Sequence, residues 1–97
     1  MKKFGLLASL KAKVGQEETV ANFLASAVEL ARQEDETLTW YSFQIDATTF
    51  GIFDSFETEA GRDAHLTGEI AKNLMANAEA LLSEPPKIDK VDILGCK

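Results

Sequence analysis

The sequence has 97 residues and a mass of 10.6 kDa, and we expect residues 1–97 to form a single domain. Its 45% hydrophobic content excludes a disordered or collagen-like chain. The 16 acidic and 10 basic residues give a formal net charge of -6 with no dense basic patch. Nucleic acid and an anionic membrane surface are therefore not expected as partners, because both would repel this charge.

The single cysteine, Cys96, excludes an intrachain disulfide. No apolar run reaches the ~18 residues of a membrane span. The apolar stretch Phe4–Leu10 follows two lysines, as in a signal peptide, but Lys11 interrupts it at the short end of the ~7–15 residues that such peptides use. We therefore expect a cytoplasmic protein with a reduced thiol.

The first expected element is a strand over Phe4–Val14, in which every even position is apolar. Gly15 ends this strand. Apolar residues then recur at helical spacing from Val20 to about Gln33, which predicts an amphipathic helix. The acidic stretch Glu34–Glu36 is expected to be a solvated turn.

Two strand-forming runs follow, Thr37–Asp46 and Thr49–Phe56, and the few residues between them predict an antiparallel hairpin. Thr58 then opens a second helix, which we expect to bend near Gly68 and to continue through Leu81.

Two prolines end that helix, because proline lacks the N–H that the helical ladder needs. A last strand is expected over Lys87–Leu94. The order strand, helix, strand, strand, helix, strand predicts a ferredoxin-like α+β fold with an antiparallel sheet and both helices on one face.

The sheet face without helices should be polar in a monomer, but its strands offer apolar residues on both sides. Tyr41, Phe43 and Ile45 alternate with Leu38 and Trp40 along the second strand. Such a surface exceeds what soluble monomers expose, so we expect a homodimer that pairs the two sheets about a two-fold axis.

His65 is the only histidine, and its unperturbed pKa lies near neutrality. Asp54, at the end of the third strand, is placed to hydrogen-bond it and to fix one tautomer of the imidazole. A histidine–carboxylate pair of this kind can act as a general base. It can equally be a histidine at the helix–sheet margin with a satisfied hydrogen bond and no chemistry.

Aromatic residues are the other candidates. Trp40 and Tyr41 should point to opposite faces of the sheet, and Phe23 and Phe53 add to an aromatic interior. Such a lining could hold a flat aromatic or quinone-like molecule. The alternative is ordinary core filling, because large aromatics dominate small cores.

The other residues that could bind a ligand or react have simpler interpretations. Arg62 is expected to form a surface ion pair with Glu59, and Met75 to lie in the core. The sequence contains no phosphate loop, metal-ligand spacing or nucleophile elbow, so no cofactor or metal is expected.

Several segments resemble the antibiotic biosynthesis monooxygenase domain over almost the whole chain. They are Phe4–Val14 closing on Gly15, Arg32–Glu34, Leu38–Tyr41, Thr49–Phe56 and Ala60–Leu66 with its Ala64–His65–Leu66 step. The resemblance implies a dimeric α+β barrel and identifies His65 with the histidine that this family commonly carries on its helix. The heme-degrading members use Asn, Trp and His at positions that align with Ala8, Phe53 and Ile70, so heme chemistry is not implied here.

Two kinds of function follow. One is a cofactor-independent monooxygenase on a small phenol or quinol, as in members of the family. His65 and Asp54 would then be the base and its orienting partner, and Trp40, Tyr41, Phe53 and Phe23 would line the substrate cavity. The other is a non-catalytic dimeric module that binds a small apolar molecule. An isomerase of the same family is a third option.

Overall fold

The computed structural model describes residues 2–97. Along the chain, its elements are β1 (Phe4–Lys11), α1 (Glu17–Ser26), α2 (Val28–Ala31), β2 (Thr37–Gln44), β3 (Thr49–Phe56), α3 (Glu59–Leu66), α4 (Glu69–Leu81) and β4 (Lys87–Asp92).

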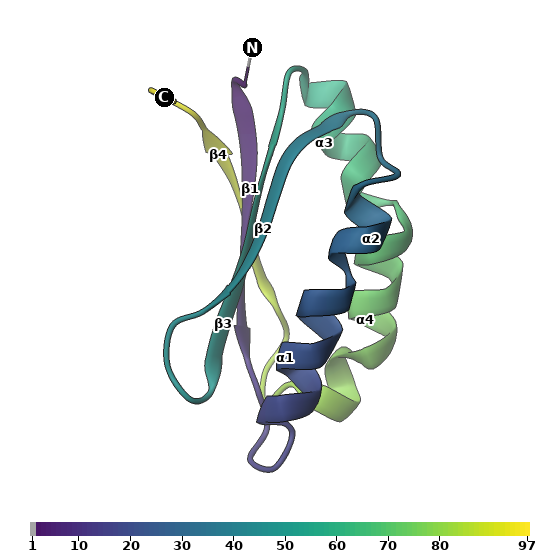
Figure 1. Ribbon diagram of the computed structural model, residues 1–97, viewed down its shortest axis with the longest axis vertical. Coiled ribbons are helices and arrows are strands. Elements are labelled where there is room, and N and C mark those ends of the chain that lie inside the picture. The colour runs from purple at the N-terminus through teal and green to yellow at the C-terminus, as the bar shows by residue number, and fades with distance from the viewer. Residues whose placement is uncertain (1) are drawn as a thin grey trace.

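The four strands form one antiparallel sheet in the order β2-β3-β1-β4. All helices lie on one face of this sheet, as Figure 1 shows. The sequence-based prediction of a ferredoxin-like α+β fold is therefore confirmed.

The core lies between the sheet and the helices. The even positions of β1 and β3 face the helices, with Leu10 and Phe50 directly paired, and both side chains are buried. Val20 and Leu24 from α1 and Leu74 from α4 close the core from above. The apolar residues that alternate along the strands and those that recur at helical spacing thus pack into one cluster.

Two boundaries and the burial of one residue differ from the sequence-based expectation. The first strand ends at Lys11, and Val14 is 93% exposed, because the chain turns at Gly15, where φ is 91°. The first helix is interrupted at Ala27, which separates α1 from α2. Met75 was expected in the core but is 58% exposed, because α4 buries Ile70 and Leu74 and turns Met75 away from the sheet.

The expected surface ion pair of Arg62 with Glu59 is wrong. The Arg62 side chain is only 7% exposed and lies over the ring of Phe4, with its guanidinium carbon 5.2 Å from the ring centroid. Its Nη1 donates to the carbonyl oxygens of Val91, at 3.2 Å, and Gly5, at 3.5 Å. Arg62 therefore joins α3 to β1 and β4 rather than facing solvent.

The sheet face opposite the helices is open and partly apolar. Tyr41 pairs with Phe53 there, and the Phe43 ring covers Gly51, where an added Cβ would lie only 2.4 Å from it. Tyr41 is 59% exposed. Leu7, on the adjoining strand β1, is half-buried on the same face. The dimer predicted for this face remains a prediction.

No helix within residues 2–97 is both long enough and apolar enough to span a bilayer.

Candidate functional site

The site is built where α3 crosses the end of β3. Asp54 points toward the helices, and α3 begins above it with Thr58 as its N-cap, whose hydroxyl oxygen accepts a hydrogen bond from the Gly61 N–H at 3.0 Å. This start places His65 in the last turn of α3. Its Nε2 lies 2.8 Å from Oδ2 of Asp54, so the structure brings these two candidate residues into direct contact.

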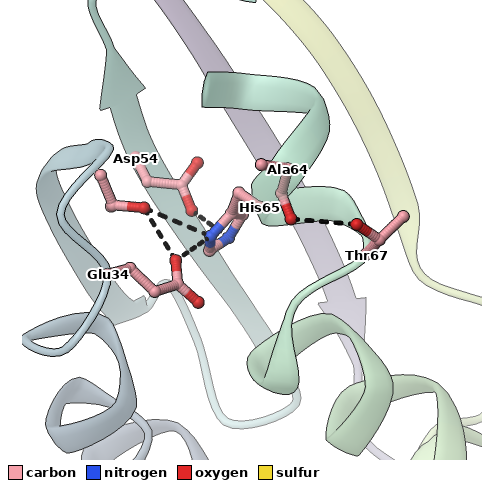
Figure 2. Close-up of polar contacts among 6 residues, drawn as sticks. Glu34, Asp54, Ala64, His65 and Thr67 are labelled. Carbon is pink, nitrogen blue, oxygen red and sulfur yellow. Dashed lines mark hydrogen bonds and ion pairs between the residues drawn. The ribbon is translucent and has the colours of Figure 1, made fainter. Parts of the chain in front are cut away.

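A second carboxylate reaches the other side of the imidazole. Nδ1 of His65 lies 2.6 Å from Oε1 of Glu34, and the Thr37 hydroxyl donates to the same oxygen at 2.8 Å. Figure 2 shows the imidazole between Glu34 and Asp54. We call Asp54, His65 and Glu34 the carboxylate–imidazole array.

Sequence reasoning missed Glu34, which it assigned to a solvated turn. The segment after α2 packs against α3 and the start of α4, where two glycines allow the close approach. A Cβ on Gly61 would lie 2.7 Å from Oε2 of Glu36, and a Cβ on Gly68 would lie 3.2 Å from Oε2 of Glu34. The sequence feature that could have indicated this contact is the pair of glycines, Gly61 in α3 and Gly68 just before α4, rather than the acidic stretch itself.

Burial lowers the pKa of His65, but hydrogen bonds and charge–charge attraction from Asp54 and Glu34 outweigh it and raise the pKa above its ordinary value. The protonated imidazole can donate from both ring nitrogens, one to each carboxylate. The Phe56 ring lies beside it, with ring centroids 5.4 Å apart. The array thus favours a charged imidazolium held in one orientation.

The raised pKa predicts a pH-dependent stability. A group whose pKa is higher in the folded state stabilises the fold fully below its unfolded pKa, here about 6.5, and loses this contribution as the pH rises through the folded value. We expect the unfolding free energy of the wild type, measured in urea between pH 6 and 9.5, to fall toward that of His65→Gln as the pH increases. A difference between the two proteins that stays constant with pH would contradict the coupling.

Two hollows adjoin His65. The outer cleft has a volume of about 370 Å³ and is lined by His65 and by acidic residues, namely Glu34, Asp35, Glu36 and Glu69. The inner cavity is much smaller, about 40 Å³, and lies between the sheet and the helices α3 and α4. Asp54 and His65 supply its polar wall, and its other lining residues are apolar. His65 therefore separates an acidic cleft from an apolar cavity.

The aromatic candidates do not gather around His65. Trp40 is the cross-strand partner of Asp54 and packs against the core, where its Nε1 has no hydrogen-bond partner within residues 2–97. Tyr41 and Phe53 pair on the opposite face of the sheet. Phe23 packs beside Leu10 and α4. Only Trp40 thus shares a face and a neighbouring position with Asp54.

Metal ligands are not grouped in the part of the chain that the structure describes. Residues 2–97 contain no cluster of three or more His, Cys, Asp or Glu side chains arranged to hold a metal ion.

No family model matches the chain, and no curated protein matches it. Among solved structures, the protein of unknown function NE2512 from Nitrosomonas europaea is 52% identical, with a TM-score of 0.98 over 100% of this chain and 94% of that one. The chain belongs to the same family as NE2512. PA3566 from Pseudomonas aeruginosa is 25% identical, with a TM-score of 0.83 over 98% of this chain and 97% of that one.

A crystal structure of an antibiotic biosynthesis monooxygenase is 20% identical, with a TM-score of 0.81 over 95% of this chain and 99% of that one. At this identity the likeness is one of fold. The family of the chain and of NE2512 therefore shares its architecture with antibiotic biosynthesis monooxygenase-like proteins.

Proposed function

We propose that the protein is a cofactor-independent monooxygenase that acts on a small phenolic or quinol-type aromatic substrate. The observation that carries this proposal is the carboxylate–imidazole array beside an apolar cavity. The shared fold with a protein named as an antibiotic biosynthesis monooxygenase supports it.

The reaction needs only the substrate and dioxygen. An electron-rich phenol or hydroquinone that loses its proton can pass an electron directly to O₂, and a phenol plus O₂ gives a quinone plus water with atoms and electrons balanced. In this proposal the His65–Asp54 pair is the acid–base group: Oδ1 of Asp54, which is unpartnered within residues 2–97, accepts the phenolic proton, and His65, fixed from its other nitrogen by Glu34, holds Oδ2 of that carboxyl group. The apolar walls exclude water from the anion that forms.

Oxygen uptake with a series of phenols and hydroquinones tests the activity. We expect the wild type to consume O₂ faster than the uncatalysed reaction and His65→Gln to lose about 10²-fold or more of that rate, as expected for a general acid–base group. Met75→Gln, an exposed change on α4, serves as the control and should retain the rate. Equal rates in the wild type and His65→Gln would remove His65 from the reaction.

A non-catalytic small-molecule-binding module is the second candidate. The occupation of both ring nitrogens of His65 by carboxylates favours it, because an imidazolium so held has no free lone pair to act as a base. Binding of phenols without oxygen uptake or conversion would support this module. Conversion of a bound compound without oxygen uptake would instead point to an isomerase.

We further propose that the open face of the sheet pairs with the same face of a second copy. Tyr41, Phe43, Phe53 and Leu7 place apolar surface on this face, and no helix of residues 2–97 covers it. A two-fold contact would bury these side chains against their equivalents and remove apolar surface from water.

A further inference from the structure

We infer that the inner cavity receives the hydroxyl end of a neutral apolar ligand, and that Oδ1 of Asp54 is the atom that accepts its hydrogen bond. The choice of a phenol rests on the proposed function, whereas the acceptor atom and the opening through which the ligand reaches the cavity are additional to it. Such binding also explains a polar atom that the fold leaves without a partner.

The unpartnered atom is well defined. Asp54 is only 2% exposed, and its Oδ2 is occupied by Nε2 of His65. Its Oδ1 is buried and has no hydrogen-bond partner within residues 2–97. A buried polar atom without a partner loses its hydration and gains no hydrogen bond in return, and the loss is larger for a charged group, so a partner from outside the chain would be strongly favoured here.

The cavity beside Asp54 has room for a small group. Its volume of about 40 Å³ exceeds the roughly 10–15 Å³ that one water molecule requires and is far below the size of pockets that enclose whole ligands, about 300 Å³ or more. Its apolar walls come from the sheet and the helices, including Leu6, Ile52 and Leu74. A hydroxyl group fits such a space, whereas an aromatic ring does not.

The residues that line the inner cavity limit the charge and the hydrogen-bonding groups of a ligand that can bind there. A carboxylate oxygen only accepts hydrogen bonds, so the ligand must donate one. An anionic ligand would be repelled by the two carboxylates of the array. An ammonium group would bring three donors to a cavity that offers one unpaired acceptor, and its remaining charge would lie against apolar walls at high cost. A neutral hydroxyl has one proton to donate and matches the single acceptor.

The body of the ligand would lie at the edge of the sheet. Ile88, on the edge strand β4, lines the cavity and is 40% exposed, while Leu66 and Ala71 line it from the helix side and are half-buried. The cavity wall therefore reaches the surface between β4 and α4. A phenol would point its hydroxyl inward and rest its ring against these apolar side chains.

The experiment compares phenol with anisole under anaerobic conditions by titration calorimetry. Anisole keeps the ring but has a methyl group in place of the donated proton. We expect the wild type to bind phenol at least about tenfold more tightly, because a hydrogen bond to a charged group is lost with anisole. Asp54→Asn should narrow this ratio toward one, since its amide can donate to the ether oxygen. Equal affinities in the wild type would overturn the inference.

Two alanines of α4 provide a matched pair. Ala71→Leu fills the space next to the cavity without touching the array and should abolish phenol binding, whereas Ala76→Leu makes the same change on the exposed side of the helix and should preserve it. No binding of phenol by the wild type would show that the cavity holds only water and would overturn the inference. Hydroxyl-selective binding without oxygen uptake would keep it and refute the monooxygenase.

Discussion

His65→Ala is expected to lower the free energy of unfolding by roughly 3–5 kcal/mol, the range seen when one member of a buried ion pair is removed. His65 is the partner of both Asp54 and Glu34, and Asp54 is almost fully buried. Without the imidazole, that carboxylate has no hydrogen-bonded partner and loses the hydration of the unfolded chain. Urea unfolding followed by circular dichroism, at one fixed protein concentration, measures the difference.

Two further variants isolate the cause. Adding Asp54→Leu to His65→Ala should recover part of the lost stability, because the unpaired carboxylate is then absent. Asp63→Ala, on the same helix, removes an exposed ion pair with Lys90 at 3.6 Å and should change the stability by about 1 kcal/mol or less. A loss below about 1 kcal/mol in His65→Ala would contradict a structural role for the array.

Tyr41→Lys is expected to convert a dimer into a monomer. Tyr41 stands on the open face of the sheet opposite the helices, so a lysine there would place a charge within the apolar surface of the proposed two-fold contact. Size-exclusion chromatography with light scattering should give twice the 10.6 kDa chain mass for the wild type and the single-chain mass for the variant.

Met75→Lys is the control for this change. Met75 is as exposed as Tyr41 but lies on α4, on the side of the molecule away from the open face. The Met75→Lys variant should have the same mass in solution as the wild type. A wild-type mass of 10.6 kDa would refute the dimer, and equal effects of the two lysines would show that the open face is not the contact.

The fold could be predicted because its local signals agree. The alternation from Phe4 to Leu10 matches the buried face of β1, and the short turn before Thr49 forms the expected hairpin, in which the Asp46 side chain accepts hydrogen bonds from two backbone N–H groups. The break at Gly68 also lies where the sequence predicted it, between α3 and α4. These features depend on residues close together in the chain.

The features that sequence reasoning missed depend on distant residues. Glu34 is 31 positions from His65, and nothing around it distinguishes it from a solvated acid. Arg62 looked like a surface residue by its i–3 spacing from Glu59, but its partners are carbonyl oxygens 29 and 57 positions away. The local sequence favours an exposed side chain in both cases, and only the packing of α3 against the sheet and against the segment after α2 decides otherwise.

The strand order has a consequence for how the chain folds. β1 is synthesised before the other three strands, yet it lies inside the sheet between β3 (Thr49–Phe56) and β4 (Lys87–Asp92). Pairing β1 with these two strands closes long segments of the chain, and this closure costs conformational entropy before the strand pairing contributes any stability. In the nascent chain one edge of β1 can pair with β3 once Phe56 has been synthesised, but its other edge stays open until Asp92 follows, and during that interval this edge is exposed to chaperones and to aggregation.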